Sequence, residues 1–468
     1  MKKKKKKLKI YRVLALILVI ITVFAVGTLT YFNVLPYKYL VPGVVVLAFI
    51  IFFIVCMLCR KTKNYVKIIS VLLTIIIMGV EIAGINYAFG TITFFNKIFD
   101  IGVRTETYGV YVLDDSKYEK VKDLDNKKIS VYSPSDKAIE KLNKEISFKE
   151  KDYDNIDEAV TSVLDKDNDA IYVNSGLMEI YKESYDKAKK LRLVGSYDIT
   201  MKSNNKLKSV KVTEKPFAVY LSGIDTSGRV NKSARSDVNL LAVVNPVEGK
   251  VLIVSIPRDY YVTLASKGAK DKLTHAGIYG VDMSMKTIED LLDIDINYYI
   301  RLNFSTLTKS IDLLDGIDVY SDRTFTPWTN KSLKIYEGVN HMDGKMALAF
   351  ARERKVYETG DRHRGENQQA IISAMITKMN NLKYLLKYKE ILNSLDQTFE
   401  TNMQYDEITN LFKKQIEERT NFEVESISLD GTGASMPTYS MGSRRLYVMQ
   451  PDYTTVTNAH NKIVDLTK

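Results

Sequence analysis

The chain has 468 residues, 46% of them hydrophobic, which is long enough for two or three domains with cores of their own. Its formal net charge of +11 is concentrated at one end, because residues 1–67 hold 13 Lys and Arg and no acidic residue. The other residues carry 54 basic and 56 acidic groups, and this near-neutral body argues against a nucleic-acid-binding protein.

Three apolar runs occupy the first hundred residues. Residues 13–37 and 39–59 contain no charged residue, and residues 68–96 contain only Glu81. Each run is long enough to cross a hydrocarbon layer of roughly 30 Å, so residues 1–96 are predicted to form a membrane region with three transmembrane helices. The basic segments MKKKKKKLKIYR and RKTKNYVK are expected to stay in the cytoplasm, which places everything after residue 96 outside the cell membrane.

Glu81 is the weak point of this topology. A carboxylate in the middle of a membrane costs about 2.5–3.5 kcal/mol on insertion scales, unless it is protonated or paired. With two spans instead of three, the rest of the chain would be cytoplasmic. The two cysteines, Cys56 and Cys59, lie in the second run, so the part of the chain beyond it has no disulfide scaffold and no cysteine-based metal site.

Residues 97–213 are predicted to form a small extracellular α/β domain. Short apolar runs predict strands at 108–113, 128–133 and 169–174, and amphipathic periodicity predicts helices at 136–146 and 155–165. No catalytic set of residues is recognisable in this accessory domain. The polar stretch 202–216 ends in a proline and is predicted to be a linker.

Residues 214–468 are predicted to form a second, larger α/β domain. Apolar runs predict its strands at 217–223, 238–245, 251–256, 297–302 and 423–429. Helical periodicity predicts its helices at 283–292, 304–314, 343–350 and 364–382.

Charged residues follow the strands of this domain. Asp225 comes just after the first strand, at the carboxyl end where α/β sheets bind ligands. Asp237 opens the second strand, and Arg235 precedes it by two residues, on the same face if the backbone is extended. Arg258 and Asp259 follow the third strand, and we expect all of these side chains to lie near one another.

Arginine is concentrated in one later segment. The chain has 51 Lys and 16 Arg, yet four of the Arg lie within residues 352–364. The spacing of Arg352 and Arg354 puts both side chains on one face of an extended segment. Arg364 and Gln368 are four residues apart and share a face of the following helix, which Asp361 is placed to cap.

The preference for arginine has a chemical reason. Arginine presents a flat, permanently charged fork of donors that fits phosphate oxygens two at a time, whereas lysine is a mobile point charge. Several convergent Arg with two Asp suit a pyrophosphate held with a divalent metal ion, the carboxylates taking Mg²⁺. The alternative is that each Arg is a solvated residue or half of a weak ion pair.

Other common catalytic motifs are missing from the sequence. None of the four histidines has the spacing of a zinc hydrolase, and there is no G-x-S-x-G motif, Walker A loop or Rossmann glycine motif.

Three segments together resemble the LytR-CpsA-Psr family of Gram-positive bacteria. They are GIDTSGRVNKSARSDVNLLAVVNPVEGKVLIVSIPRDYYV, KLTHAGIYG and MDGKMALAFARERKVYETGDRHRGENQQ. The three apolar runs and the accessory domain are similar to the CpsA-type members that accompany capsule genes. The resemblance implies an α/β/α catalytic domain with a hydrophobic tunnel for lipid.

The resemblance also implies roles for individual residues. Asp225 and Asp237 would be the carboxylates that hold Mg²⁺ or Mn²⁺. The pyrophosphate-binding residues would be Arg235, Arg258, Lys272, Arg352, Arg354, Arg364 and Gln368. Arg258, Arg352 and Arg354 would also act in catalysis, and Asp259 is a candidate base.

The implied function is a Mg²⁺-dependent phosphotransferase. It would move a capsular polysaccharide or a related anionic glycopolymer from undecaprenyl pyrophosphate to peptidoglycan. The expected partners are the lipid-linked glycopolymer, peptidoglycan, membrane lipids and capsule-biosynthesis proteins, with no nucleic acid. Two alternatives remain open: a non-catalytic protein that binds lipid-linked polymer or regulates capsule synthesis, and a hydrolase that uses water as acceptor.

Overall fold

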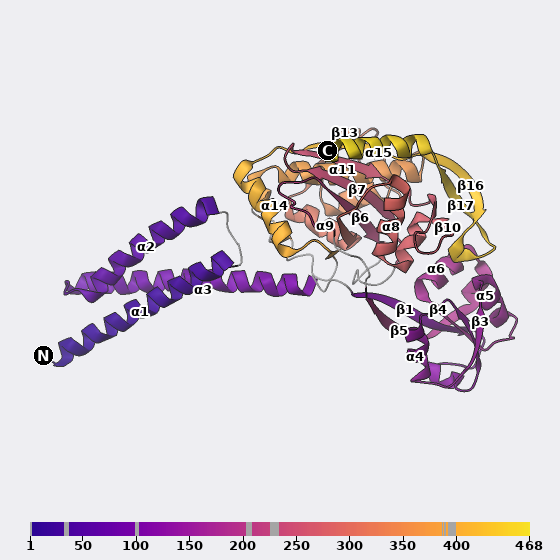
Figure 1. Cartoon of the computed structure of the whole chain (residues 1–468), viewed down its shortest axis with the longest axis horizontal. Helices are drawn as coiled ribbons and strands as arrows, with labels where there is room; N and C mark the ends of the chain where they lie inside the picture. Colours follow the sequence, from indigo (N-terminus) through magenta and orange to yellow (C-terminus); the bar gives the residue numbers. More distant parts are fainter. Residues whose placement is uncertain are drawn as a thin grey trace. The chain divides into compact units, whose positions relative to one another are not determined.

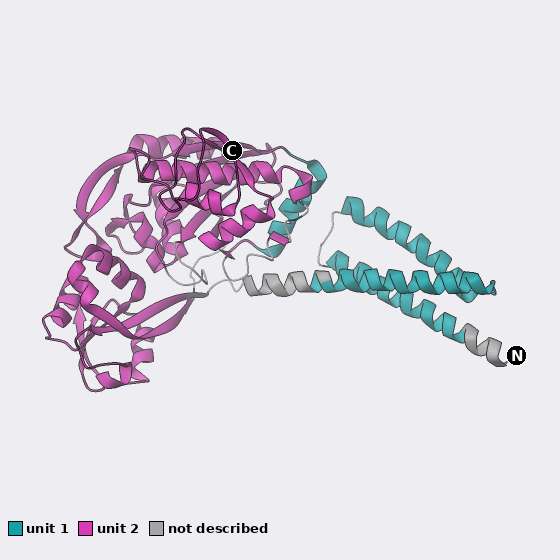
Figure 2. Ribbon diagram, turned by 180° about the vertical axis from the view of Figure 1, so that it is seen from behind, with its two compact units in different colours: residues 1–97, 385–389, 404–420 teal, residues 98–384, 390–403, 421–468 magenta. Residues whose placement is uncertain are grey.

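The computed structural model describes residues 2–31, 37–98, 103–202, 208–224, 234–385, 387, 390–391 and 399–468. The chain divides into two compact units, shown in different colours in Figure 2. The first comprises Met1–Lys97, Leu385–Lys389 and Gln404–Thr420, and the second comprises Ile98–Tyr384, Glu390–Met403 and Asn421–Lys468.

The first unit is helical. Its described elements are α1 (Lys2–Tyr31), α2 (Tyr37–Cys59), α3 (Asn64–Ile98) and α14 (Tyr405–Glu418). Among the described residues, three stretches are long and apolar enough to cross a membrane: Lys9–Tyr31, Tyr37–Cys59 and Asn64–Asn86. Each of them overlaps one of the three apolar runs of the sequence.

Glu81 has a partner inside this helical unit. Its side chain is buried, and the hydroxyl of Thr22 on α1 donates a hydrogen bond of 2.7 Å to Glu81 Oε1. Polar side chains between apolar helices pair in this way because hydrocarbon offers no other partner. The contact gives a physical reason for α3 to tolerate a carboxyl group at this position.

The second unit begins with a five-stranded sheet, in the order β3-β2-β4-β1-β5 over the residues described (Figure 1). Its strands are β1 (Val103–Leu113), β2 (Lys128–Tyr132), β3 (Lys149–Tyr153), β4 (Ala170–Asn174) and β5 (Leu191–Lys202). The helices are α4 (Asp136–Asn143), α5 (Ile156–Leu164) and α6 (Ser175–Ser184), with short 3₁₀ turns η1 (Val121–Leu124) and η2 (Asp186–Lys190). β2 pairs in parallel with both β3 and β4, because α4 and α5 provide the crossovers.

A six-stranded sheet forms the centre of the larger domain, in the order β14-β11-β6-β7-β8-β15 over the residues described. The strands are β6 (Phe217–Ile224), β7 (Val238–Asn245), β8 (Lys250–Ser255), β11 (Tyr298–Asn303), β14 (Phe399–Thr401) and β15 (Glu423–Ser428). β6, β7 and β8 are buried along most of their length, which is why the sequence shows them as continuous apolar runs.

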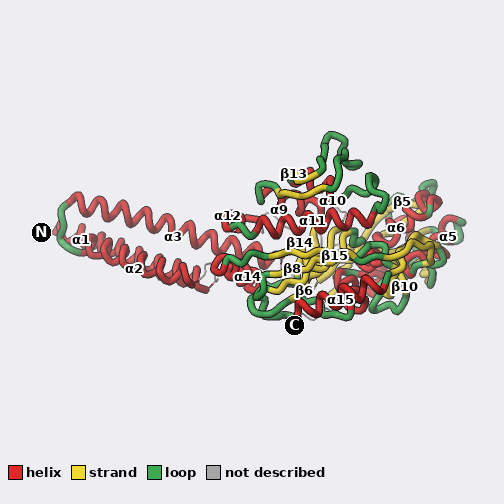
Figure 3. Tube along the Cα trace, turned by 90° about the horizontal axis from the view of Figure 1, so that it is seen from above, coloured by secondary structure: helices red, strands yellow, loops and turns green. Residues whose placement is uncertain are grey.

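Helices cover both faces of this sheet, as Figure 3 shows. One face carries α9 (Phe304–Leu313), α10 (Gly344–Ala351), α11 (Asp361–Met379) and the hairpin of β12 (Ile317–Ser321) and β13 (Gly338–Met342). The other face carries α15 (Tyr453–Thr467), labelled in Figure 3, and α8 (Val281–Leu292), which packs in the same apolar cluster. The fold of this domain is therefore α/β/α, as predicted.

Smaller elements surround the ends of the strands. They are β9 (Tyr261–Thr263), β10 (Lys270–Lys272), α7 (Leu273–Ala276), η3 (Gly277–Tyr279), α12 (Leu382–Leu385), β16 (Gly431–Pro437), η4 (Tyr439–Met441) and β17 (Arg445–Pro451). One apolar cluster contains residues of α5 and α6 together with Ile278 and Met441, so the two α/β domains share part of a core. The predicted boundary after residue 213 falls between β5 and β6 and stays a prediction.

Candidate functional site

A small polar pocket lies beyond the carboxyl ends of β8 and β15, at the start of α11. Its volume is about 20 Å³. Its charged and amide side chains are Asp237, Asn239, Arg258, Asp361, Arg362, Arg364 and Gln368. The helix can approach β8 closely because residue 365 is glycine: a Cβ there would lie 2.6 Å from the Ser255 hydroxyl. Strand ends of α/β sheets are where such folds bind ligands.

Arg258 is the central cation of the pocket. Its Nη1 donates to Asp237 Oδ1 at 2.8 Å, and its Nε lies 3.3 Å from Asp361 Oδ2. Burial alone would lower the pKa of this guanidinium, but Asp361, Asp237 and Asp259 outweigh it and hold the pKa above its ordinary value. Arg258 is therefore a permanent charge whose position is fixed by carboxylates.

Asp237 stays ionised for the complementary reason. Burial would raise the pKa of its carboxyl group, but Arg258 and Arg235 outweigh that effect, so the pKa is lowered. The main-chain N–H of Asp237 donates to the carbonyl of Gly223 at 2.8 Å. The main-chain carbonyl of Asp237 accepts a hydrogen bond from Arg364 Nη2 at 3.3 Å. Arg258 and Arg235 thus keep Asp237 charged, and the contacts to β6 and α11 fix its place.

The segment around Ser236 is fastened on several sides. The Ser236 hydroxyl lies 2.9 Å from the Tyr220 hydroxyl and 2.8 Å from that of Ser222, both on β6. On the opposite side Gly277 comes so close that a Cβ would lie 2.6 Å from the carbonyl oxygen of Ala234. These contacts hold the neighbours of Ser236, which include both Arg235 and Asp237.

Arg301 supports the same segment and was not predicted from the sequence. It lies on β11, its side chain is buried, and its Nη2 donates to the carbonyl of Ala234 at 3.3 Å. Its Nη1 lies 3.9 Å from Glu400 Oε2 on β14. The available signal was a charged residue inside the otherwise apolar strand NYYIRLN, since a buried charge needs a partner.

The start of α11 differs from the prediction. The helix begins at Asp361, and its N-cap is Gly360, whose φ of 53° favours glycine. The expectation that Asp361 caps the helix is therefore wrong. Its carboxylate instead lies between Arg258 and Arg364, with Oδ1 3.0 Å from Arg364 Nη2. Arg364 and Gln368 share the face that lines the pocket, as expected.

The loop after α10 is not the extended segment that the sequence suggested. Arg352 ends α10 in a helical conformation, with φ −97° and ψ −4°, and its guanidinium lies 4.8 Å from the centre of the Phe304 ring. Glu353 is fully buried and accepts main-chain N–H groups of Trp328 at 2.6 Å and Lys355 at 2.7 Å. This buried carboxylate folds the chain back on itself, so the alternation of an extended strand is lost.

The side chain of Arg354, in the same loop, is exposed to solvent. Within the part of the chain that the structure describes, its guanidinium has no ion pair. It lies close enough to Arg364 that the repulsion contributes, after burial and Arg258, to lowering the pKa of Arg364. Arg354 is therefore a charge near the pocket that no acid among the described residues neutralises.

The remaining predicted residues have varied positions. Lys272 Nζ lies 2.9 Å from Oδ1 of Asp259, the residue that follows Arg258 in the chain. Arg235 binds Glu183 of α6 with both Nη atoms. Asp225 lies outside the described residues. Arg362, one of the four Arg within residues 352–364, pairs with Asp430 at 2.9 Å and lines the polar pocket.

An apolar cavity of about 70 Å³ adjoins the polar pocket. It lies between the sheet and the helices α9 and α11, and its larger apolar side chains are Leu221, Val238, Leu240, Leu302, Phe304, Leu307, Ile371 and Ile372. Gln368 lines both spaces. One helix face therefore separates a charged pocket from a hydrocarbon-lined one.

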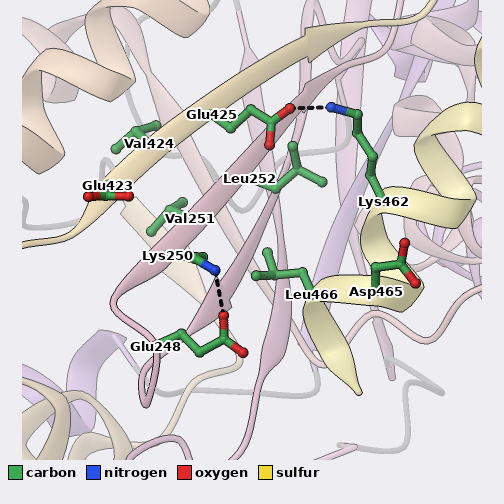
Figure 4. A pocket seen from close by; sticks show the side chains of 10 residues that line it. All are labelled: Glu248, Lys250, Val251, Leu252, Glu423, Val424, Glu425, Lys462, Asp465 and Leu466. Atoms are coloured by element: carbon green, nitrogen blue, oxygen red, sulfur yellow. Dashed lines mark hydrogen bonds and ion pairs between the residues drawn. The ribbon is translucent and has the colours of Figure 1, made fainter.

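A wider hollow of about 430 Å³, drawn in Figure 4, lies at the other end of the sheet. It is bounded by the amino ends of β8 and β15 and by the end of α15. Lys250 pairs with Glu248 at 2.8 Å, and Lys462 pairs with Glu425. Exposed pairs of this kind contribute little energy, and the lining contains no arginine, so this hollow lacks the chemistry of the polar pocket.

The chain is similar to a family of known proteins. The model of the LytR_cpsA_psr family matches residues 177–462. A relative from Enterococcus faecalis, named polyisoprenyl-teichoic acid--peptidoglycan teichoic acid transferase TagU, is 34% identical over 224 residues, which cover 47% of this chain and 72% of the relative. A relative of the same name from Bacillus mycoides is 33% identical over 236 residues, covering 50% and 76%.

The chain is also similar to solved structures. The structure titled TagT bound to LIIa-WTA is 28% identical, with a TM-score of 0.47, and the match covers 57% of this chain and 96% of that one. B. subtilis TagV is 26% identical, with a TM-score of 0.47, covering 54% and 98%.

Proposed function

Because the chain belongs to the LytR_cpsA_psr family, we propose that it transfers a phosphate-linked glycopolymer from a polyprenyl pyrophosphate carrier to peptidoglycan. The names of the TagU relatives support this class of donor and acceptor. The observation that carries the proposal is the convergence of Arg258, Arg364 and Asp237 on a polar pocket that shares Gln368 with an apolar cavity. A polyprenyl pyrophosphate has a charged part and a hydrocarbon part, and the two spaces match them.

The reaction is a displacement at phosphorus. A hydroxyl oxygen of the acceptor attacks the phosphorus next to the sugar, and the bond from that phosphorus to the oxygen bridging the two phosphates breaks. Polyprenyl phosphate leaves, and the polymer remains joined to the acceptor through a phosphodiester. The hydroxyl proton passes to a base, for which Asp259 is the candidate because it lies beside Arg258 with its Oδ1 on Lys272.

The arginines supply charge rather than covalent chemistry. Phosphoryl transfer depends mainly on positioning and on neutralising the oxygens of the transferred group. Arg258 is held in place by carboxylates, and Arg354 has no ion pair among the described residues. A phosphate can therefore bind Arg354 without breaking an existing pair, while Arg258 and Arg364 stay in fixed positions beside it.

The apolar cavity supports binding of the prenyl chain. Each buried CH₂ group contributes about 0.8 kcal/mol, so even the first isoprene unit adds several kcal/mol of affinity. A cavity of about 70 Å³ holds only the beginning of such a chain. Binding of a longer carrier requires α9 and α11 to move apart from the sheet.

Mg²⁺ or Mn²⁺ is part of the proposal, with Asp237 and Asp225 as the protein ligands. Among the described residues, no group of three or more His, Cys, Asp or Glu side chains is arranged to hold a metal ion. Mg²⁺ commonly takes only one or two protein carboxylates and fills its other positions with water and phosphate oxygens, and Asp237 at the pocket wall fits that use. When bound, the ion would neutralise charge on the pyrophosphate.

The proposal also covers the orientation of the membrane helices and the identity of the polymer. We propose that α1, α2 and α3 span the cell membrane with the amino terminus in the cytoplasm, which places the second unit outside, where the acceptor is. The basic segments at the start of the chain and between α2 and α3 support this orientation. The polymer would be a capsular polysaccharide or a related anionic glycopolymer, and capsule-biosynthesis proteins would be further partners.

The test uses the full chain in detergent with a polyprenyl-pyrophosphate-linked glycan, a soluble peptidoglycan fragment and Mg²⁺. Mass spectrometry should detect a phosphodiester-linked conjugate of glycan and fragment, and chelation should abolish it. Free glycan phosphate without conjugate would instead identify a hydrolase. An intact donor that nevertheless binds would identify a non-catalytic binding protein.

A further inference from the structure

The accessory domain contributes an acid that pairs with Arg235, two residues before Asp237 of the polar pocket. Glu183, in the last turn of α6, accepts hydrogen bonds from Arg235 Nη1 at 2.6 Å and from Arg235 Nη2 at 2.9 Å. The side chain of Glu183 is 58% exposed and that of Arg235 is 30% exposed. The pair is therefore well formed but open to solvent, so its partners can be exchanged.

The place of Glu183 is fixed by contacts on both sides of it. Arg444 Nε donates to the Tyr181 hydroxyl at 3.0 Å, and the same guanidinium lies 3.5 Å from the centre of the Tyr185 ring. Tyr181 also donates to Asp157 on α5 at 2.5 Å. The last turn of α6 is thus attached to the segment that leads into β17, and Glu183 is presented to the larger domain rather than left on a free helix end.

The place of Arg235 is fixed as well. Its neighbour Ser236 is bonded to β6, and its neighbour Ala234 is bonded to Arg301. Its own guanidinium is near Asp237, but Asp237 Oδ1 accepts from Arg258. Glu183 is therefore the acid that takes both terminal nitrogens of Arg235.

Those two nitrogens are the donors that a phosphate would use. A guanidinium binds a carboxylate or a phosphate through the same pair of parallel N–H groups. The two anions cannot occupy that edge together. The pyrophosphate of the donor carries two negative charges in all, one on each phosphate, whereas a carboxylate carries one. An exposed carboxylate pair contributes about 1 kcal/mol or less, so exchange in favour of the pyrophosphate is favourable.

We propose that Glu183 is a built-in competitor for the donor: it occupies Arg235 in the empty protein, and the pyrophosphate displaces it on binding. This inference rests on the proposed function and names a regulation of the same site. The accessory domain then sets the affinity of the pocket for the donor. Any partner that moves α6 changes that affinity without touching the pocket.

The test measures binding to the full chain in detergent, with geranylgeranyl pyrophosphate and inorganic pyrophosphate as separate probes, by titration calorimetry. Glu183→Gln should lower the Kd for both probes by about two- to fivefold, because the competing charge is lost. The control is Glu179→Gln, which removes the same charge from an exposed position one turn earlier on α6 and should leave Kd unchanged.

A double variant separates competition from a change of fold. Arg235→Ala should weaken binding, and adding Glu183→Gln to it should have no further effect on Kd. An unchanged or raised Kd in Glu183→Gln alone would overturn the inference, as would an equal fall in Glu179→Gln. If the unaltered protein binds neither probe, the proposed function fails too; if it binds them and Glu183→Gln matches it, only this inference fails.

Discussion

Replacing Arg354 by alanine separates the function of the pocket from its stability. Arg354 is exposed, and its guanidinium has no ion pair within the described part of the chain. The fold of its loop comes instead from Glu353, whose buried carboxylate accepts main-chain N–H groups. The change therefore removes a cation without leaving a buried acid unpaired.

The two expected effects differ in size. A surface substitution of this kind changes the free energy of unfolding by about 0.5 kcal/mol or less. A hydrogen bond to a charged group contributes about 1.5–3 kcal/mol, which corresponds to a fall of about 10- to 150-fold in kcat/KM for transfer. Arg354→Ala should thus be well folded and nearly inactive.

The assay compares initial rates of conjugate formation and unfolding midpoints for the full chain. Lys355→Ala is the matched control, because it removes the same charge from the next residue, whose ammonium group lies 3.1 Å from the centre of the Trp328 ring. Its transfer rate should stay within about twofold of the unaltered protein, since no lost phosphate contact is expected there. A full transfer rate in Arg354→Ala, or an equal loss in both variants, would refute the assignment of Arg354.

Two further predictions concern stability. Arg258→Ala should destabilise the fold by about 3–5 kcal/mol in chemical unfolding, because it removes the cation paired with Asp237 Oδ1 and leaves Asp361 with Arg364 alone; a loss below about 1 kcal/mol would contradict the central place of Arg258. His363 stacks on Tyr357 at 3.4 Å, and burial lowers its pKa more than Glu366 raises it. The fold therefore favours neutral His363. The stabilisation that this side chain contributes is fully present above the unfolded-state pKa of about 6.5, and it is lost as the pH falls through the lower folded-state pKa. His363→Gln should lose this acid-dependent component, and an identical pH profile would contradict it.

The central strands of the larger domain could be predicted from the sequence because they are buried on both faces. The edge strand β15, whose side chains are exposed or half-buried, was also predicted within one residue at each end. Among the buried strands, β7 was predicted with its observed bounds, Val238–Asn245, and β6, β8 and β11 within one residue at each end. Continuous apolar runs give this signal without any knowledge of neighbouring strands. The hairpin of β16 and β17 was missed, because GTGASMP is small and partly exposed and shows no apolar run.

The residues of the candidate site were easier to name than to place. Motif spacing selected Arg258, Asp237 and Arg364, which the structure brings to one pocket. The spacing rule failed at Arg352, because this residue is the C-cap of α10 with a helical conformation, and Glu353 then turns the chain. Spacing describes only local periodicity, whereas these turns depend on a buried carboxylate and its distant N–H donor.

The ion pairs were also beyond reach of the sequence. Glu183 and Arg235 are separated by 52 residues and belong to different domains. Either residue alone looks like an ordinary surface charge. Their contact depends on how α6 packs against the segment around Met441 and Arg444, and that packing is a tertiary property.

In the proposed reaction the acceptor attacks the phosphorus next to the sugar. The most direct measurement quantifies both products of a single reaction by mass spectrometry, using the full chain, lipid-linked glycan, peptidoglycan fragment and Mg²⁺. Attack at phosphorus should give equal amounts of phosphodiester-linked conjugate and polyprenyl monophosphate. Release of polyprenyl pyrophosphate with a conjugate that contains no phosphorus would place the attack on the sugar carbon instead, and would refute the proposed reaction.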